Sequence, residues 1–558
     1  MKLQVTLAAA FAAALSGCAT WSVQEAPAAA AASMSADAML EQIRTLSSDA
    51  FGGRLPGSDG EEQTVNYLVR QFRTLGLAPG NPDGRFVQDV ALTGIDSNAR
   101  MKIRARGHSI HFASGRDFVA ETSRAEPAID VADSPLLFVG YGVQAPEYQW
   151  DDYKGVDVHG KTLVMLINDP PVADAEHPAQ LDDRMFKGRA MTYYGRWTYK
   201  FEIASRLGAD AVLIVHQTAP AAYPWDVVAN SWSGEHFELS TADRNRGRVP
   251  VQGWITLAKA QELFRASGEN FEALQRAAAK PDFKPVELKA KAEFHLRNKL
   301  REVHSQNVVA RLNGAEPNGE EILYTAHWDH LGTKAGRHGD RIFNGALDNA
   351  SGVAGLLQLA RAYTRLPQAP RRSVVFMAVT AEEQGLLGSR AYCAQPLAPL
   401  AKTWADINMD GLNPWGKTRD LQLVGQGQND LEALLRKVAA RHSRVVTLDA
   451  EPEKGFYYRS DQFEFAKAGV PGLYTGAGID YLGRPAGWGL KKRDDFTAHD
   501  YHKPSDEVKP DWNLDGAIAD LQILFEVGWN IANGDHRPEW SADSEFRAVR
   551  EAQLAAAP

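Results

Sequence analysis

Short apolar segments alternate with helical segments in the C-terminal half of this 558-residue sequence. Residues 321–325 and 373–379 have the pattern of buried strands, and residues 350–366 between them carry apolar side chains at helical spacing. Such alternation indicates strands that lie side by side in a sheet with helices on both of its faces. The predicted fold class is therefore α/β, with a mixed central sheet flanked by helices.

Acidic and imidazole side chains follow these apolar segments one after another. In open α/β sheets, functional residues collect beyond the carboxyl ends of the strands, so we expect these side chains to converge at one edge of the sheet. They are His327 and Asp329 in AHWDHLG, Asp348 in GALDNASGVAG, Glu382 and Glu383 in TAEEQGLLGS, Asp410 in INMDGLN, and His502 in DYHKPSDEV.

Each of these residues has an ordinary structural explanation when it is taken alone. A single His after a strand is usually a hydrogen-bonded structural residue, Asp348 could cap a helix, and Glu382 and Glu383 could lie on a solvated face. The strand at 374–379 changes this interpretation, because it directs the two glutamates to the end of a sheet. Two imidazoles with several carboxylates are the ligands that a pair of hydrolytic metal ions requires.

The spaced set HxD, DNASG, EEQGLLGS, NMDG and YHKPSDE resembles the M28 family of dinuclear zinc peptidases, which includes bacterial aminopeptidases and glutamate carboxypeptidases. The resemblance covers about residues 37–125 and 291–535 and implies a zinc-dependent exopeptidase fold. It also implies the metal ligands. His327 and Asp410 would hold one zinc, Glu383 and His502 the other, and Asp348 would bridge the two.

Asp329 and Glu382 fall on the two catalytic acid positions of that family. Asp329 is two residues from His327 and is suited to hold its imidazole in the correct tautomer. Glu382 neighbours a ligand without being one, which is the position of a general base that takes a proton from water. Tyr501 falls where some members keep a tyrosine that donates to the developing oxyanion. Zinc is the expected metal, and manganese or cobalt would fit similar ligands.

Three other imidazoles lie close to these positions in the sequence. We expect His330, His338 and His499 to be structural or to lie at the rim of the site.

The length of the chain predicts two or more domains. Residues 131–290 carry none of the candidate ligands, and KFEIASRLGADAVLIVH within them resembles a protease-associated (PA) domain; the alternative is an unrelated β-rich insertion. An inserted domain is expected to narrow the cleft and so to favour short peptides. The predicted segments are a signal peptide (1–17), a flexible tether (18–36), an M28-like catalytic domain (37–130 and 291–540), a β-rich PA-like insertion (131–290) and a C-terminal tail (541–558).

The N-terminus has a short basic start, an apolar stretch and then Leu-Ser-Gly-Cys ending at Cys18. This arrangement resembles a bacterial lipoprotein signal, which would leave Cys18 as the lipidated first residue; the alternative is an ordinary signal peptide cut near Ala19. The expected location is the periplasmic side of the outer membrane, with membrane contact only through the lipid. The net charge of −9 argues against nucleic acid as a partner. The oligomeric state stays open.

The function that these features predict is an exported zinc-dependent exopeptidase, with an aminopeptidase acting on short peptides as the leading interpretation. A carboxypeptidase of the glutamate type would need a basic cluster, which Arg459, Arg484 or residues 491–493 could supply. A third alternative is a binding or receptor protein on the same scaffold without activity. The sequence contains neither the Gly-x-Ser-x-Gly elbow of serine hydrolases nor the His-Glu-x-x-His motif.

Overall fold

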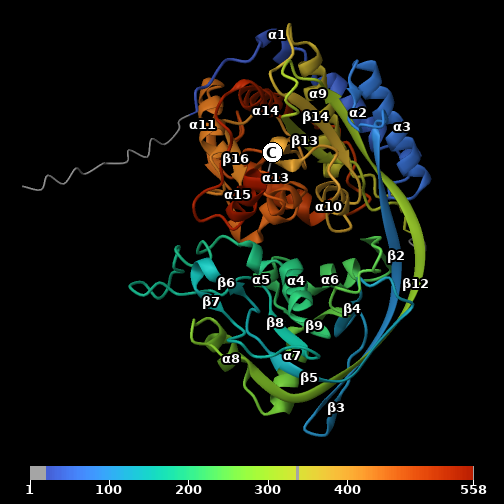
Figure 1. The fold of residues 1–558 in the computed structure, drawn as a ribbon, viewed down its shortest axis with the longest axis vertical. Helices are drawn as coiled ribbons and strands as arrows, with labels where there is room; N and C mark the ends of the chain where they lie inside the picture. The colour runs from blue at the N-terminus through green and yellow to red at the C-terminus, as the bar shows by residue number, and fades with distance from the viewer. Residues whose placement is uncertain (1–20, 335–338, 557–558) are drawn as a thin grey trace, which may run out of the picture.

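Two long antiparallel strands join the two lobes of the protein. The structure is a computed structural model that describes residues 21–334 and 339–556. These strands are β2 (Val87–Ala105) and β12 (Val286–Leu312), and they run along one side of both lobes (Figure 1). One lobe contains the N- and C-terminal parts of the described chain, and the other contains its middle. We call them the outer-chain lobe and the middle lobe.

The outer-chain lobe is built on a mixed sheet in the strand order β17-β16-β18-β15-β13-β14-β12. Strands β14, β13, β15 and β18 are parallel to one another, whereas β12 and β16 are antiparallel to their neighbours β14 and β18. This confirms the predicted fold class. The strands are β13 (Glu321–His327), β14 (Ser373–Val379), β15 (Thr403–Asn408), β16 (Asp420–Val424), β17 (Val445–Leu448) and β18 (Gly472–Gly476).

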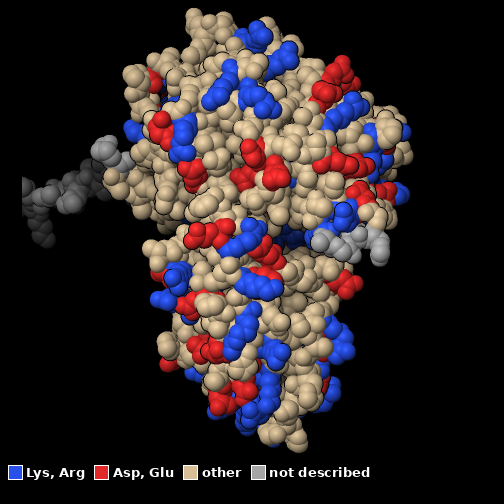
Figure 2. All heavy atoms as spheres, turned by 90° about the vertical axis from the view of Figure 1, so that its right-hand side faces the viewer, with Lys and Arg blue, Asp and Glu red and all other residues tan. Residues whose placement is uncertain are grey.

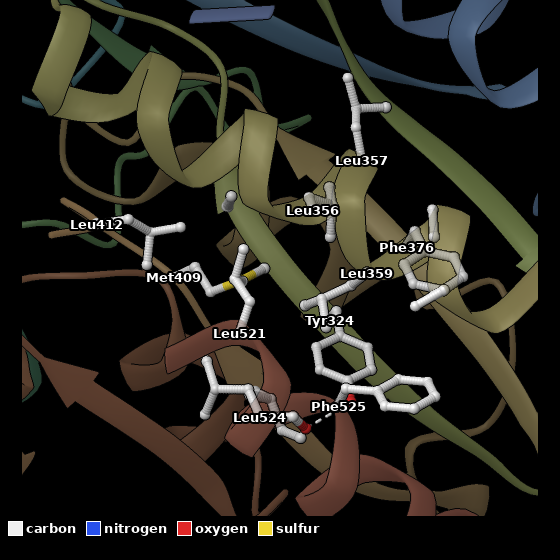
Figure 3. Packing of buried hydrophobic residues seen from close by; sticks show 14 of the residues in the cluster. Tyr324, Leu356, Leu357, Leu359, Phe376, Met409, Leu412, Leu521, Leu524 and Phe525 are labelled. Atoms are coloured by element: carbon white, nitrogen blue, oxygen red, sulfur yellow. Dashed lines mark hydrogen bonds between the residues drawn. The ribbon is translucent and has the colours of Figure 1, made fainter. Parts of the chain in front are cut away.

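Helices cover both faces of this sheet because successive strand residues point to opposite sides. Tyr324 of β13 and Phe376 of β14 pack against α9 (Ser351–Thr364) and α14 (Asp515–Asn533) (Figure 3). Leu323, next to Tyr324, points the other way into a smaller core with α10 (Leu387–Ala394) and α12 (Gln462–Lys467). The remaining main helices of this lobe are α2 (Ala36–Leu46), α3 (Asp59–Thr74), α11 (Leu431–Arg441) and α13 (Trp488–His499).

The structure differs from the predicted tether between residues 21 and 36. Trp21, Ala30 and Met34 are buried in the main core of the outer-chain lobe, and α1 (Ala28–Ala31) lies within this segment. The Trp21 Nε1 donates to the carbonyl of Asp430 at 3.0 Å. The segment is rich in alanine, and it packs because small side chains let its backbone approach the helices of the lobe. Residues 1–20, including Cys18, lie outside the described residues.

The predicted C-terminal tail also packs on the outer-chain lobe. It contains α15 (Arg547–Ala556), and Phe546 and Arg550 are buried. Arg550 donates to the carbonyls of Leu400 and Thr403 at 2.9 and 2.7 Å. These bonds attach the segment to the turn that precedes β15 and to the first residue of that strand.

The middle lobe has its own hydrophobic core and a sheet in which four parallel strands lie side by side. Its core begins at Met101, so the lobe starts earlier than the predicted boundary at residue 131, because β2 continues from one core into the other. Helices pack on the sheet, which makes the lobe α/β. Its main elements are β4 (Phe118–Glu121), β5 (Ala128–Phe138), β8 (Thr162–Leu166), α4 (Trp197–Leu207), β9 (Ala211–His216), α5 (Thr218–Ala221), α6 (Trp225–Ser231), β10 (Glu235–Leu239), β11 (Val251–Thr256), α7 (Leu257–Ser267) and α8 (Phe271–Ala278).

Oppositely charged side chains pair across the connecting strands. Lys299 of β12 lies opposite Asp96 of β2, with Nζ 3.5 Å from Oδ2. Arg104 of β2 forms an ion pair with Glu293 of β12, which lies diagonally across the ladder from it, opposite Lys102. Figure 2 shows that basic and acidic side chains are intermixed on the side of the molecule along which these strands run in Figure 1. Such exposed pairs contribute little to stability individually, but they favour the observed strand register. Among the described residues, none of the helices is both long and apolar enough to span a membrane.

Gly528 of α14 provides a test of the packing between α14 and the sheet. A Cβ at Gly528 would overlap the hydroxyl of Tyr324, which donates to the carbonyl of Leu524 at 2.9 Å. Gly528→Ala is therefore expected to lower the free energy of unfolding by about 1–3 kcal/mol, although alanine normally favours a helix. Urea denaturation would measure this change. In a Tyr324→Phe background, which lacks the hydroxyl, the same substitution should cost less; an equal cost would contradict the packing described.

Candidate metal centre

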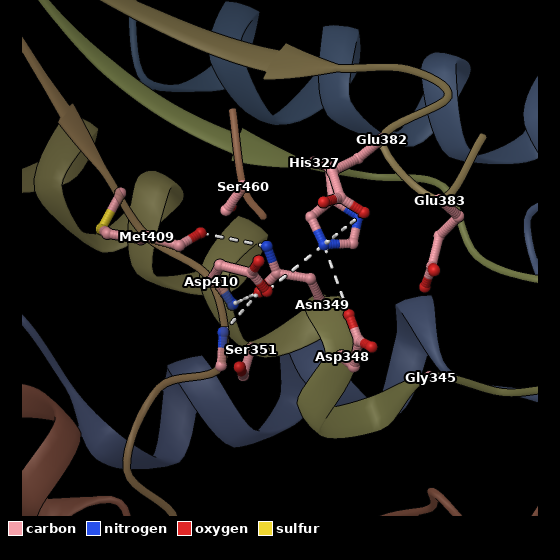
Figure 4. A network of polar contacts seen from close by, with 12 residues as sticks. His327, Gly345, Asp348, Asn349, Ser351, Glu382, Glu383, Met409, Asp410 and Ser460 are labelled. Atoms are coloured by element: carbon pink, nitrogen blue, oxygen red, sulfur yellow. Dashed lines mark hydrogen bonds and ion pairs between the residues drawn. The ribbon is translucent and has the colours of Figure 1, made fainter. Parts of the chain in front are cut away.

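The candidate residues come together at the carboxyl ends of three neighbouring strands (Figure 4). His327 is the last residue of β13, Glu382 and Glu383 lie in the loop after β14, and Asp410 follows β15. Asp348 lies just before α9. Because β13 is parallel to both of its neighbours, all three strands direct their following loops to the same edge of the sheet.

His327, Asp348 and Asp410 form the first group of donor atoms. The Nε2 atom of His327 lies 3.3 Å from Asp348 Oδ1 and 3.3 Å from Asp410 Oδ1. One donor atom from each of the three residues lies within 4.8 Å of the other two. The imidazole of His327 is completely buried, so the strand holds it in one position.

The second group uses the other oxygen of Asp348. The Nε2 atom of His502 lies 3.2 Å from Asp348 Oδ2 and 3.1 Å from Glu383 Oε2. Asp348 therefore contacts one imidazole with each of its two carboxylate oxygens. The loop after α13 delivers His502, more than 100 residues beyond the other members of this group.

His330 also lies in the second group. Its Nδ1 atom is 2.6 Å from Glu383 Oε1, and His330, Asp348 and Glu383 have donor atoms within 4.8 Å of one another. The sequence prediction assigned this residue a structural or rim position. The structure shows a fully buried imidazole in contact with a candidate ligand. Its spacing of three residues from His327, directly after a strand, was the available sequence signal.

Asp329 is buried beside His327, but its carboxylate does not reach the imidazole at hydrogen-bonding distance. Asp329 Oδ1 is 3.7 Å from His327 Nδ1, while the backbone carbonyl of Asp329 is 3.2 Å from the same nitrogen. The carboxylate instead accepts hydrogen bonds from the backbone amides of Glu382 and Glu383 at 3.0 and 3.3 Å. Asp329 thus ties the loop after β14 to the end of β13.

Tyr501 packs its ring on the imidazole of His502, with ring centroids 3.9 Å apart. The side chain remains 43% exposed, which is consistent with a position at the mouth of the site. No described contact connects its hydroxyl to the donor groups.

Asp506 positions the loop that carries Asp348. Its carboxylate accepts from the backbone amides of Leu347 and Asp348, both at 3.0 Å. Asp506 belongs to the YHKPSDE motif, but the sequence prediction gave it no role.

Arg54 joins two segments of the site through hydrogen bonds to their backbones. Its guanidinium donates to the carbonyls of Trp328, Asn344 and Gly345, at 2.8, 2.6 and 2.9 Å respectively. The residue comes from a turn-rich loop near the N-terminus. Nothing in the sequence around it indicated these contacts, because its partners are backbone atoms.

The charges in the site strongly shift the pKa values of its members. Burial by itself would lower the pKa of His327, but the carboxylates of Glu382 and Asp410 outweigh burial and raise this pKa well above its usual value. Burial opposes ionisation of Glu383, yet His502 and His330 lower the pKa of that carboxyl to about 2. Burial also works against His502, whose pKa is raised to about 10, mainly by Glu383.

The donor set fits divalent metal ions. Four carboxylates, on Asp348, Glu382, Glu383 and Asp410, lie around the imidazoles, and no Lys or Arg forms an ion pair with them in the part of the chain that is described. Buried carboxylates need a compensating charge. Imidazole nitrogens and carboxylate oxygens are also the donors that zinc prefers.

Residues 307–525, which contain every residue of the two donor groups, match the family model described as Peptidase family M28. This segment of the chain is therefore similar to the peptidases that the family model describes. The chain is also similar to Aminopeptidase NAALADL1 of Mus musculus (27% identical, covering 41% of this chain and 29% of the relative) and to the Vacuolar membrane protease of Schizophyllum commune (28% identical, 32% and 18%). The chain spans less than a third of the length of either of these curated relatives.

Solved structures show a likeness over most of the chain. An aminopeptidase from Aneurinibacillus sp. strain AM-1 has a TM-score of 0.48 and 18% identity, covering 90% of this chain and 95% of that one. A zinc aminopeptidase from Bacillus subtilis has a TM-score of 0.43 and 19% identity, covering 94% and 98%.

Replacing Asp506 tests the support of the Asp348 loop. Asp506→Ala removes both acceptors for the backbone amides and is expected to weaken zinc binding by about 10–100-fold, as loss of an outer partner of a ligand typically does. Competition with a chromophoric chelator would measure the affinity. Asp494→Ala, at an exposed position of α13, is the control and should bind zinc like the unchanged protein. Unaltered affinity in Asp506→Ala would contradict this role.

Proposed function

We propose that this protein is an exported zinc-dependent exopeptidase and, more narrowly, an aminopeptidase that acts on short peptides. The observation that carries the proposal is the pair of donor groups that share Asp348 at the sheet edge, inside the segment that matches Peptidase family M28. The name of the mouse relative, an aminopeptidase, supports cleavage from the amino end.

The residues divide into two ligand groups. His327 and Asp410 would hold one zinc ion, Glu383 and His502 would hold a second, and Asp348 would contribute one oxygen to each. His330 is the alternative imidazole of the second group, because its Nδ1 also contacts Glu383. When bound, zinc would polarise the scissile carbonyl and lower the pKa of a water molecule.

Glu382 is the proposed general base. It lies beside the first group, with Oε2 4.0 Å from His327 Nε2, and is a member of neither group of donor atoms. The hydrogen bond from its backbone amide to Asp329 fixes the position of the loop. From there its carboxylate takes a proton from the attacking water and passes it to the leaving amine. Tyr501, at the mouth, is the proposed donor to the oxyanion of the tetrahedral intermediate.

The proposed location is the periplasmic side of the outer membrane, through a lipid on Cys18. Only two residues, Ala19 and Thr20, separate Cys18 from Trp21, which is buried in the outer-chain lobe. Such a spacing spans on the order of 10 Å even when fully extended. A lipid there would hold the outer-chain lobe close to the membrane surface.

Replacing Glu382 tests the proposed base. Glu382→Gln keeps the size of the side chain and removes its basicity, so kcat for peptide hydrolysis should fall by about 100- to 10,000-fold. Zinc content, measured on the same preparation, should stay unchanged. Glu507→Gln, at an exposed position, is the matched control and should retain full activity. Substantial activity in Glu382→Gln would overturn the assignment.

Removal of the metal tests both the site and the alternative of an inactive binding protein. Dialysis against a chelator should abolish hydrolysis and lower the melting temperature, and added zinc should restore both, because a ligand at 1,000 times its dissociation constant stabilises by about 4 kcal/mol. His327→Ala should show no melting response to zinc at the concentration that saturates the unchanged protein. A zinc response without hydrolysis of any peptide would favour the binding protein.

A further inference from the structure

The turn that carries Glu382 contains a residue in an unfavourable backbone conformation. Ala381, between Thr380 and Glu382, has a φ angle of +53°, and it is fully buried. A residue with a side chain adopts this left-handed region only where the surrounding structure holds it there. On one side of Ala381, the bond from the Glu382 amide to Asp329 holds the turn. The contacts of Thr380 must hold it on the other side.

A chain of three hydrogen-bonding side chains ends on Thr380. Glu61 Oε1 accepts from Ser305 Oγ at 2.8 Å, and Ser305 Oγ lies 2.5 Å from Thr380 Oγ1. The three residues come from α3, from β12 and from the position directly after β14. Glu61 is 6% exposed, Ser305 is 1% exposed and Thr380 is fully buried. Water therefore does not compete for these bonds, and the chain connects α3 to the turn through the protein interior.

Helix capping accounts for only one of the two carboxylate oxygens of Glu61. Oε2 accepts from the backbone amide of Gly57, as an acidic residue in the first turn of a helix commonly does. Oε1 is directed to Ser305 of β12 instead. In the part of the chain that is described, no Lys or Arg forms an ion pair with Glu61. Because a buried carboxylate without a cation destabilises a protein, the contact of Oε1 needs an explanation other than capping.

The protonation state of Glu61 sets the direction of this chain. An ionised carboxylate can only accept, so Ser305 donates its single proton to Glu61, and Thr380 must then donate to Ser305. A protonated carboxyl can donate to Ser305, and the chain can then run in the opposite direction. The ionised form therefore permits one arrangement of the Thr380 hydroxyl, whereas the protonated form permits two.

Glu61 changes its protonation state in the neutral range. Burial raises its pKa to about 7, although the Gly57 amide and the Ser305 hydroxyl oppose this shift, and the charge of Asp329 adds to it. The loop after β14 also contributes Glu382 and Glu383, whose carboxylates lie at the metal centre. The other charged groups of the surrounding elements are exposed or bonded to other partners; they are Arg54, Asp59, Glu62, Arg301, Glu302 and His304.

We propose that Glu61 is a positioning residue for peptide hydrolysis, because the chain through Ser305 and Thr380 holds the turn that presents Glu382. This inference rests on the proposed function, in which Glu382 is the general base. Asp329 fixes the turn after Ala381, and the chain from Glu61 fixes it before Ala381. Glu61 acts through these residues and does not touch the substrate.

Glu61→Gln tests the role of the charge. Glutamine resembles the protonated carboxyl in size and cannot ionise. The ratio of kcat in the unchanged protein to kcat in the variant should be about 10–100 at about pH 8.5 and close to one at about pH 6, where the unchanged protein also carries an uncharged Glu61. The ratio cancels the effect of pH on groups that both proteins share. Glu62→Gln, at the exposed next position of α3, is the matched control and should give a ratio near one at both pH values.

Two substitutions of Thr380 test the chain at its other end. Thr380→Val keeps the shape of the side chain and removes the hydroxyl, so kcat at about pH 8.5 should fall by about 10–100-fold while KM stays within a few-fold. Thr380→Ser keeps the hydroxyl and should retain most of the activity. In the Thr380→Val background, Glu61→Gln should cause no further loss of kcat, because the chain is already interrupted. Melting temperatures would show that each variant folds, and the Thr380 pair tests the chain by itself if Glu61→Gln does not.

Zinc affinity tests the chain independently of peptide hydrolysis. Glu383, a proposed zinc ligand, lies in the same turn three residues after Thr380. In competition with a chromophoric chelator, Thr380→Val should bind zinc about 10–100-fold more weakly than the unchanged protein, and Thr380→Ser should bind it about as well. This difference together with no hydrolysis of any peptide would refute the proposed function alone. Equal zinc affinity in Thr380→Val and the unchanged protein, or a Glu61→Gln ratio that is the same at both pH values, would overturn the positioning role.

Discussion

The concentration of carboxylates at one edge of the sheet is the constraint on which the rest of the outer-chain lobe depends. Asp348, Glu382, Glu383 and Asp410 lie around buried imidazoles, and such like charges repel one another unless cations lie between them. The surrounding structure must therefore hold each of them against that repulsion. It does so mainly through hydrogen bonds to backbone groups of the loops that carry these carboxylates.

Three buried residues illustrate how the backbone is held. Asp506 accepts from the amides of the Asp348 loop, Asp329 accepts from those of the Glu382 loop, and Arg54 donates to carbonyls on both sides of the site. Backbone partners position a whole loop, so the side chains that face the site keep their donor atoms free. Gly345 contributes in a different way, because a Cβ there would lie 2.6 Å from His330 Cγ. A residue with a side chain at position 345 would therefore collide with the imidazole of His330.

The middle lobe borders the candidate metal centre as well as the outer-chain lobe. Strands β2 and β12 run along both lobes, and direct contacts such as the hydrogen bond from the Met191 amide to the Pro452 carbonyl also join the lobes. The middle lobe also contacts the loop of the candidate base, since the Phe237 amide donates to Gln384 Oε1 at 3.2 Å. Residues far apart in the sequence, such as Arg196 and Arg459, therefore become neighbours at one place.

Elements with strong periodic patterns were predictable. The strand expected at 321–325 is β13 (Glu321–His327), and the one expected at 373–379 is β14 with the same bounds. The length of β2 was not, because residues 86–125 alternate like several short strands and only their pairing with β12 makes one of them 19 residues long. The prediction of a flexible tether was wrong for residues 21–36 for a related reason. An alanine-rich composition indicates that a segment has little apolar area to bury. It does not show whether the folded lobe offers a surface on which the small side chains can pack.

The sequence alone determined which side chains could bind metal, since their chemistry and their positions after apolar segments depend only on local order. His330 shows the limit of that reasoning, because whether an imidazole contacts Glu383 or packs elsewhere depends on the path of a loop. Tertiary structure alone decided the roles of Arg54 and Asp506, whose partners are backbone atoms. It also decided that Arg196 and Arg459, which form no ion pair among the described residues, lie at the same junction, because their positions depend on how two separately folded cores pack together.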